Sequence, residues 1–258
     1  MLWSFATGFA DNRRSGVDSR SFYDEVWVSR EAAQKEEHML FLRQQAIEHS
    51  YSLLGDLRNK ALLEIGSGSG KQAVFFAKQG AKVSVVDISS ESLKAVSLIA
   101  EELGVAVQSY QMNAEKMDFK DETFDQVYIN SVLMHVEPEK VLRECSRVLK
   151  PGGRVVIVEP LRYAPFVQIY RFLSSYRKMC PNYATLQMFT KNSFYFTMFS
   201  HEEFYFLSSA LLPIGYSTST PLKKMYTLMS KVDRALLKRI PFLKKLCWIS
   251  VVCYTKQR

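Results

Sequence analysis

The sequence has no long hydrophobic run and no paired cysteines, and each absence narrows the class of protein. The longest apolar runs, such as residues 247–254, are far too short to cross a bilayer as a helix. The N-terminus has no basic region followed by a long apolar region, so it does not match a secretory signal. The four cysteines form no CxxC pair, which argues against a zinc site or a disulfide framework and predicts a reduced, cytoplasmic protein without a metal centre.

The excess of basic over acidic residues is confined to the C-terminal tail. The formal net charge of the chain is +8. Residues 221–258 contain ten Lys or Arg and one acid, Asp233, so this tail alone carries +9 and the rest of the chain is nearly neutral. A basic bias over the whole chain would indicate a nucleic-acid partner, whereas this local bias indicates a local basic surface.

Strand and helix patterns alternate between residues 61 and 160. Short apolar runs that end in turns predict strands, and longer segments with helical spacing predict helices. This alternation is typical of a doubly wound α/β fold with a parallel sheet. The predicted strands are 61–65, 82–87, 105–110, 124–130 and 154–159, and the predicted helices are 71–79, 90–103 and 138–149.

Outside this core the pattern differs on both sides. Residues 31–50 have helical spacing of apolar side chains. Residues 160–213 lose the alternation and hold 14 aromatic side chains. After them we expect a strand at 214–217, a basic amphipathic helix at 222–240 and a last strand at 247–254. We therefore divide the chain into an N-terminal helical cap (1–60), an α/β core (61–159), an aromatic insertion (160–213) and a C-terminal segment that completes the sheet (214–258).

A glycine-rich turn, Glu64-Ile65-Gly66-Ser67-Gly68-Ser69-Gly70, lies between the first predicted strand and the first core helix. Glycine lets the backbone turn sharply and approach a ligand closely. The dinucleotide fingerprint fails because its third glycine would be Lys71, and the phosphate-binding P-loop fails at Ile65 and Gln72. The remaining pattern resembles motif I of the class I S-adenosylmethionine (SAM)-dependent methyltransferases. The alternative is a glycine-rich turn without a ligand.

The resemblance continues along the core in the same order and spacing. Residues 124–136 resemble motif IV and the segment after it, and residues 150–154 resemble the turn before the fifth strand. The family fold implies a seven-stranded, mostly parallel Rossmann-like sheet whose last strand is antiparallel and lies beside the fifth. It also implies SAM as the cofactor.

Several residues are candidates for binding SAM. Asp87 ends the second predicted strand about 20 residues after the first glycine, where an acid accepts hydrogen bonds from ribose hydroxyls; the alternative is a helix cap, although Ser89 or Ser90 would serve better. Asn113-Ala114-Glu115 resembles the segment that borders adenine, with an ordinary Asx-turn as the alternative. Tyr23 resembles an N-terminal aromatic that closes over the sulfonium, unless it only packs. The full predicted set is Glu64, Gly66, Ser67, Gly68, Gly70, Asp87, Ile88, Asn113, Ala114, Glu115, Asn130 and Tyr23.

Two residues are candidates for catalysis. His135 follows the fourth strand, where ligand crevices open in such sheets, and could act as a general base; the alternative is a packing histidine. Glu159 ends the fifth strand in a similar position, with hydrogen bonding to nearby backbone amides as the alternative. His201 lies in Ser200-His201-Glu202-Glu203, which resembles the first turn of a surface helix capped by Ser200.

The aromatic insertion 160–213 is predicted to be a lid over the acceptor, although most of its aromatics are expected to be core. Such a lid suits a small molecule with an apolar or aromatic portion, for example a metabolite, lipid or glycan precursor. An RNA methyltransferase and a non-catalytic SAM-binding protein are the alternatives. The helix 222–240 could contact an anionic membrane surface, but we prefer packing on the sheet with solvated lysines. Its predicted apolar face is Leu222, Met225, Met229, Val232, Leu236 and Ile240.

Overall fold

The computed structural model describes residues 42–173, 182–214 and 220–257. Tyr23 and the rest of segment 1–41 lie outside the described residues. The strands are β1 (Ala61–Ile65), β2 (Lys82–Asp87), β3 (Val107–Gln111), β4 (Phe124–Asn130), β5 (Leu149–Pro160), β6 (Met198–Phe204) and β7 (Ile249–Thr255). The helices are α3 (Gln44–Leu54), α4 (Lys71–Lys78), α5 (Ser90–Glu102), α6 (Pro138–Val148), α7 (Pro165–Leu173), α9 (Leu186–Lys191) and α10 (Thr220–Arg239), with short 3₁₀ helices η1 (Leu133–His135), η2 (Asn192–Tyr195), η3 (Ser208–Ile214) and η4 (Pro241–Leu246).

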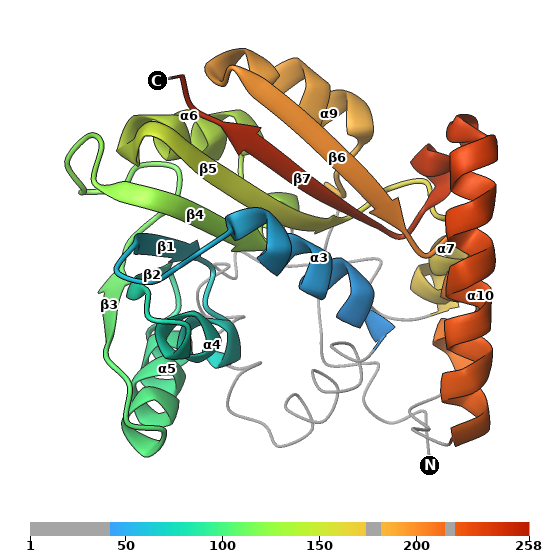
Figure 1. Cartoon of the computed structure of the whole chain (residues 1–258), viewed down its shortest axis with the longest axis horizontal. Coiled ribbons are helices and arrows are strands. Elements are labelled where there is room, and N and C mark those ends of the chain that lie inside the picture. The colour runs from blue at the N-terminus through green and yellow to red at the C-terminus, as the bar shows by residue number, and fades with distance from the viewer. Residues whose placement is uncertain (1–41, 174–181, 215–219, 258) are drawn as a thin grey trace.

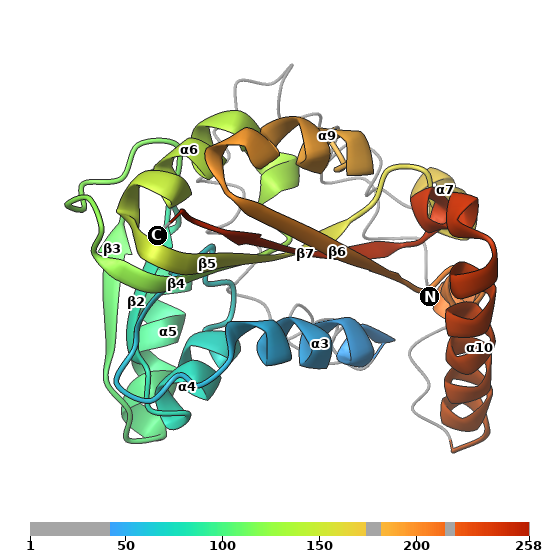
Figure 2. The same cartoon turned by 45° about the horizontal axis from the view of Figure 1, so that its top comes forward.

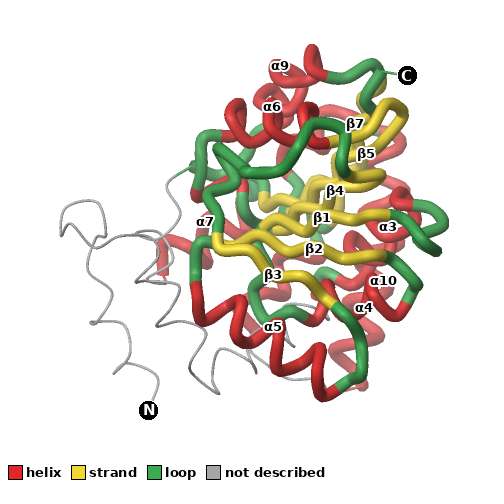
Figure 3. The backbone as a smooth tube through the Cα atoms, turned by 90° about the vertical axis from the view of Figure 1, so that its left-hand side faces the viewer, coloured by secondary structure: helices red, strands yellow, loops and turns green. Residues whose placement is uncertain are grey.

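The strands form one seven-stranded sheet in the order β3-β2-β1-β4-β5-β7-β6. The first five strands in the chain are parallel to one another. Strand β7 is antiparallel to both β5 and β6. Figure 3 shows this order along the sheet from β3 to β7. The predicted Rossmann-like topology is therefore confirmed, including the last strand beside the fifth.

Helices cover both faces of the sheet. Figures 1 and 2 show α3, α4 and α5 on one face and α6 and α9 on the other. The central strands are apolar because both of their faces are buried: Val155, Val156, Ile157 and Val158 of β5 have no exposed surface. Side chains alternate between the two cores, so Val156 and Val158 face α3 while Val155 and Ile157 face α6.

The region around His201 is a strand, which corrects the predicted helical turn. Residues 198–204 pair along their whole length with β7, and Ser200 is opposite Cys253. Ser200 and Glu203 have the spacing of a capping box, which explains the wrong prediction. The Glu203 carboxylate instead accepts hydrogen bonds from Ser250 and His201. Of the strand predicted at 214–217, Ile214 ends η3 and the other residues lie outside the described chain.

Helix α10 is rotated relative to the predicted orientation. Its buried side holds Tyr226, Ser230, Asp233 and Leu237, while Met225, Val232 and Ile240 of the predicted apolar face are exposed. Leu222 and Met229 do pack against the core. Asp233 explains the rotation, because its carboxylate accepts hydrogen bonds from the Leu207 and Ser208 amides and the Ser208 hydroxyl. No helix in the described residues has the length and hydrophobicity needed to span a bilayer.

Candidate active site

The glycine-rich turn between β1 and α4 has a backbone that only glycine suits. Gly66, Gly68 and Gly70 have φ of 79°, 49° and 79°, a region that side chains disfavour. A Cβ on Gly66 would lie 2.3 Å from Cγ2 of Val132, and a Cβ on Gly70 would lie 2.8 Å from Cα of Val96. The turn therefore lies directly against the segment that follows β4.

Asp87 fastens this turn from the end of β2. Its Oδ2 accepts hydrogen bonds from the Ser67 amide (2.8 Å) and the Ser67 hydroxyl (3.1 Å), and its Oδ1 accepts from the Ser89 amide (2.9 Å). The cap of α5 is Ser89, whose hydroxyl accepts from the Ser92 amide. A carboxylate can accept further hydrogen bonds, so Asp87 keeps acceptor capacity for ribose hydroxyls. That role stays a prediction.

The segment after β3 forms the Asx-turn that was the alternative for Asn113. The Asn113 Oδ1 accepts from the Glu115 amide at 2.9 Å, and the Asn113 side chain is exposed. Glu115 in turn accepts from the Glu137 amide (2.8 Å) and pairs with Lys140 (3.6 Å). Ala114 is buried between them. A contact between Asn113 and adenine stays a prediction, and it would use mainly the side-chain amide group as donor.

The remaining predicted cofactor residues lie along the carboxyl ends of the strands. Glu64 is buried near the end of β1, and Ser67 is buried within the turn. Ile88 is half-buried, and its carbonyl accepts a hydrogen bond from Gln111 at 3.0 Å. The structure thus gathers the predicted residues from β1, β2, β3 and β4 at one edge, as expected for a parallel sheet.

A polar network at the end of β4 includes residues that the sequence did not reveal. Asn130 Oδ1 accepts from Arg43 Nη2 (2.6 Å), and Asn130 Nδ2 donates to Gln72 Oε1 (3.0 Å). Gln72 Nε2 then donates to the hydroxyls of Tyr51 (3.2 Å) and Tyr128 (3.1 Å). Arg43 was missed because a single Arg before a helix carries no motif. Only the fold brings it to Asn130.

Ser131, the residue after β4, has a strained backbone. Its φ is +61°, which is uncommon outside glycine and frequently marks a functional turn. The Ser131 amide donates to the Val158 carbonyl (2.9 Å), and its hydroxyl donates to Asn130 Oδ1 (3.1 Å). These bonds hold the chain in the turn that presents Val132 to Gly66.

Glu159, near the end of β5, binds the backbone of the segment after β4. The Glu159 side chain is fully buried, and its Oε1 accepts from the amides of Val132 (2.6 Å) and Leu133 (2.7 Å). Burial raises the pKa of Glu159 to about 7, although these two hydrogen bonds and the nearby Arg43 act in the opposite direction. Hydrogen bonding to backbone amides, the alternative for this residue, is thus present. A catalytic role for Glu159 stays a prediction.

His135 ends the 3₁₀ helix η1 on the same segment. It is half-buried, and its amide donates to the Val132 carbonyl at 2.9 Å. Burial lowers the pKa of His135 to about 4, so the imidazole is neutral near pH 7. A neutral imidazole is able to accept a proton, but a base with this pKa is weaker than one matched to neutral pH. Its predicted role as a general base is not tested by this geometry.

The aromatic insertion divides into a packed part and an exposed part. Phe189, Phe196, Phe204 and Tyr205 are buried against the two faces of the sheet, so these four aromatics are core, and the expectation that most of the insertion's aromatics are core stays a prediction. Tyr163 and Phe194 are 54% and 67% exposed. Helix α7 follows β5 in the chain and packs on η3, which also contacts α10. The lid function stays a prediction.

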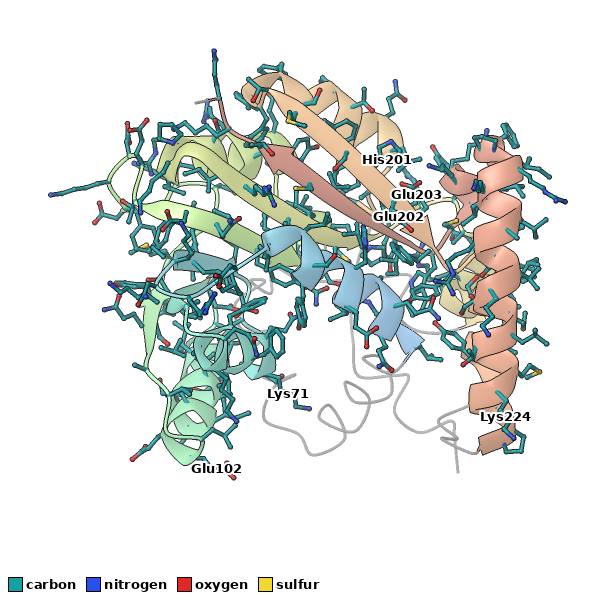
Figure 4. The ribbon with its side chains drawn as sticks, viewed as in Figure 1. Lys71, Glu102, His201, Glu202, Glu203 and Lys224 are labelled. Carbon is teal, nitrogen blue, oxygen red and sulfur yellow. The ribbon has the colours of Figure 1, made fainter. Side chains whose placement is uncertain are left out.

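His201 lies on β6 next to two acids (Figure 4). Its Nδ1 is 2.6 Å from Oε1 of the buried Glu203, which also accepts from Ser250 at 3.1 Å and lies 3.6 Å from Lys244. The His201 side chain is only 29% exposed, so the predicted surface position is wrong in detail. This group is a structural anchor between β6, β7 and η4.

The fold and the glycine-rich turn together resemble those of the class I SAM-dependent methyltransferases. A family model described as a methyltransferase domain matches residues 63–157 of this chain. This segment includes most of β1 and β5, all of β2, β3 and β4, and the glycine-rich turn. The part of the sequence that resembled the family is therefore a methyltransferase domain.

The relatives agree with this class. The chain is 34% identical over 112 residues to the ubiquinone biosynthesis O-methyltransferase of Alkalilimnicola ehrlichii, covering 43% of this chain and 45% of that protein. The chain thus matches less than half the length of this curated relative. A geranyl diphosphate C-methyltransferase from Streptomyces coelicolor, solved with S-adenosyl-L-homocysteine, has a TM-score of 0.62 at 16% identity and covers 83% of this chain and 76% of its own.

A further solved structure shows that this fold alone does not determine the reaction. The [4+2]-cyclase SpnF has a TM-score of 0.56 at 17% identity, covering 83% of this chain and 82% of its own. By its name, this protein catalyses a cyclisation. The fold is therefore shared with an enzyme of another reaction type, and the chemistry must be argued from the site.

Proposed function

We propose that this protein transfers a methyl group from SAM to a small molecule that has an apolar or aromatic portion, and that it does so in the cytoplasm. The observation that carries the proposal is the turn 66–70. Its three glycines have positive φ, Gly66 lies against Val132, and Ser67 is tied to Asp87, a backbone arrangement suited to close approach of the cofactor. In support of a reducing compartment, Cys145, Cys247 and Cys253 are free thiols.

Each part of the site would have a separate task. The turn 66–70 and Asp87 would bind the adenosine, with Asn113 at the adenine edge. SAM, when bound, supplies an electrophilic methyl group on a sulfonium. The chain itself would align the acceptor with that methyl, exclude water and, where the acceptor carries a proton, accept it at His135 or Glu159.

The acceptor class follows from the aromatic insertion. An exposed aromatic side chain such as Tyr163, which follows the carboxyl end of β5, is suited to hold a flat or apolar acceptor. The relatives support a small-molecule acceptor by their printed names, ubiquinone biosynthesis in one case and geranyl diphosphate in another. Those names include one O-methyltransferase and one C-methyltransferase, so they do not favour one acceptor atom.

The experiment combines binding with transfer. Calorimetry with S-adenosylhomocysteine tests the cofactor site, and labelled-methyl SAM is incubated with lipid, polar-metabolite, RNA and protein fractions of a cell extract. We expect micromolar binding and label in the lipid or metabolite fraction. Label in RNA would favour an RNA methyltransferase, and binding without transfer to any fraction would favour a non-catalytic SAM-binding protein. Either result would contradict the proposal.

We also propose that α10 contacts an anionic membrane surface from residues 222–240. The packed side of α10 leaves a second apolar stripe in solvent, formed by Met225, Leu228 and Val232 at helical spacing. Exposed Lys224, shown in Figure 4, and Lys231 flank this stripe. An apolar stripe flanked by lysines suits the interface of an anionic bilayer.

Vesicle sedimentation tests the membrane contact. The protein should sediment with vesicles of phosphatidylserine and phosphatidylcholine more than with phosphatidylcholine alone, because each Lys near an anionic surface adds attraction. Leu228→Glu should abolish the difference. Leu98→Glu, on the exposed side of α5, is the matched control because Leu98 is 68% exposed and Leu228 is 63% exposed. Equal sedimentation of both variants with wild type would reject the contact.

A further inference from the structure

The loop 112–117, which follows β3, is bound to α6, although β3 is not a neighbour of the strand that leads into α6. Strands β2 and β1 lie between β3 and β4 in the sheet, and α6 follows β4 in the chain. The Met117 amide nevertheless donates to Glu144 Oε2 (2.8 Å), and Arg147 Nη2 donates to the Met117 carbonyl (2.8 Å). The loop after β3 and the helix after β4 are therefore joined directly by side chains of α6.

Glu115 connects the same loop to the start of α6. Its Oε1 accepts a hydrogen bond from the Glu137 amide (2.8 Å), and its Oε2 lies 3.6 Å from Lys140 Nζ. Glu137 is the N-cap residue of α6, and its own side chain makes no capping hydrogen bond. A carboxylate at this end of a helix satisfies an amide that has no partner within the helix, and the helix dipole favours its charge. Glu115 thus caps α6 from a different element of the fold.

The segment between β4 and α6 is held near both of its ends by carboxylates. Near its first end, Glu159 Oε1 accepts from two backbone amides, at 2.6 and 2.7 Å. At its other end, Glu115 accepts from Glu137, two residues after His135. The His135 amide donates within the segment, to the Val132 carbonyl at 2.9 Å. The position of His135 is therefore fixed in part by Glu159 from β5 and in part by Glu115 from the loop after β3.

We propose that Glu115 is a positioning residue, which transmits binding of the cofactor at the loop 112–117 to the segment that carries His135. The inference rests on the proposed function, which places the adenine edge of SAM at Asn113. The Asn113 Oδ1 accepts from the Glu115 amide (2.9 Å), so a ligand that engages the Asn113 side chain acts directly on the backbone of Glu115. The hydrogen bond from Glu137 to the Glu115 carboxylate then carries any displacement of this turn to the start of α6.

Four variants separate the hydrogen bond to Glu137 from the charge of Glu115. Glu115→Gln keeps the length of the side chain and an acceptor oxygen, whereas Glu115→Asp keeps the charge on a side chain one methylene shorter. Glu115→Ala removes both the acceptor and the charge. Lys140→Met removes the ion pair and leaves the bond between Glu115 and Glu137 in place, so it is the matched control.

The measurement is the NMR resonance of the His135 imidazole without and with saturating S-adenosylhomocysteine. The chain has four histidines, so the resonance that disappears in His135→Gln identifies this side chain. Calorimetry in parallel gives the affinity of each variant for S-adenosylhomocysteine, and the spectra show that each variant is folded. A purely structural role of Glu115 would lower stability without changing how the His135 resonance responds to the ligand.

We expect S-adenosylhomocysteine to displace the His135 resonance in wild type, Glu115→Gln and Lys140→Met, and to leave it nearly in place in Glu115→Asp and Glu115→Ala. Rescue by glutamine but not by aspartate would show that the bond to Glu137 carries the effect. Equal displacement in all four variants overturns the inference, as does a resonance that stays in place in wild type. Loss of binding in Glu115→Gln would assign Glu115 to direct cofactor contact and also overturns it. Wild type that does not bind S-adenosylhomocysteine overturns the proposed function instead.

Discussion

The two halves of this sheet differ in how their strands find their partners. On one side, the pairs β1–β2, β2–β3 and β4–β5 join strands that follow each other in the chain, and only the pair β1–β4 joins more distant strands. On the other side, β6 pairs with β7, which follows it only after η3, α10 and η4. The first half is specified by local sequence signals, and the second half by contacts that form only in the folded chain.

The halves also differ in what they leave exposed. In the first half, the turn at Gly66 is packed against Val132 without spare room. In the second half, Tyr163, Phe194 and Met198 remain more than half exposed. The packing at the glycine-rich turn is thus tighter than the packing at these three side chains. Substitutions in the first half should therefore have larger effects than those in the second.

The largest effect is expected for Gly66→Ala. The new Cβ would meet Val132 at 2.3 Å in a backbone with positive φ, so strain and overpacking should together lower the free energy of unfolding by about 2–5 kcal/mol. Urea denaturation measures this. Gly104→Ala is the control, because Gly104 has φ of 64° but open space around its Cβ, and should cost only about 1–2 kcal/mol. Equal losses would show that the contact with Val132 is unimportant.

The next effect is a pH dependence at the boundary between the halves. The raised pKa of Glu159, about 7 against 4.5, means that the folded protein binds a proton more tightly than the unfolded chain. The stability from this group is present below about pH 4.5 and is lost as pH rises to about 7, by about 3 kcal/mol. Glu159→Gln should remove this loss in denaturation measured at pH 5 and pH 7.5.

In the same denaturation experiment, His135 should change the stability with pH in the opposite direction to Glu159. Its pKa is lowered from 6.5 to about 4, so its contribution is present above pH 6.5 and is lost as pH falls toward 4. His135→Gln should therefore make the protein relatively more stable at acid pH, while Glu159→Gln should make it relatively more stable at neutral pH. Parallel pH profiles for the two variants would contradict both assignments.

A smaller effect is expected for cofactor binding at Asp87. Asp87→Ala should weaken S-adenosylhomocysteine by about 1.5–3 kcal/mol, because the carboxylate both fastens the turn and would accept from the ribose. Asp125→Ala is the control at the opposite end of the sheet, where Asp125 accepts from the Ala61 amide and from Lys150. Calorimetry should show unchanged affinity for Asp125→Ala. Unchanged affinity for Asp87→Ala would remove Asp87 from the site.

The smallest effect on stability is expected in the aromatic insertion. Phe194→Ala should change the free energy of unfolding by less than about 0.5 kcal/mol, because the ring is mostly exposed and makes a tilted contact with Tyr195. Phe189→Ala, whose ring is fully buried, should cost about 3–5 kcal/mol. Thermal denaturation measures both. A large loss for Phe194→Ala would show that this part of the insertion belongs to the core.

Much of the first half was predictable because its signals are local. The bounds of β1, β2 and β4 agree with the predicted strands, and the glycine turn and Asp87 were found from spacing alone. The wrong predictions all involve distant contacts. Ser200 and Glu203 matched a helix cap until pairing with β7 made them a strand, and the face of α10 was decided by Asp233 binding η3.

The candidate site divides in the same way. The residues of the turn 66–70 were identified from the sequence, because the spacing of glycines indicates where the backbone has positive φ. Arg43 and Gln72 were not, because their position depends on α3 crossing to β4, which no local pattern encodes. For Asn113 and Glu159, the sequence offered two roles each. The structure shows the hydrogen bond of an Asx-turn at Asn113 and a hydrogen bond from a backbone amide to Glu159.

The contact between Gly66 and Val132 also has a consequence for how this protein can change over evolutionary time. The two positions lie in turns after different strands, yet a side chain at one occupies the space of the side chain at the other. Among descendants of this sequence, alanine at position 66 should arise mainly after position 132 has become smaller, so the two sites should mutate in a fixed order. Substitution at position 66 in the glycine-rich turn is thereby limited by the size of the side chain at position 132, in the segment after β4.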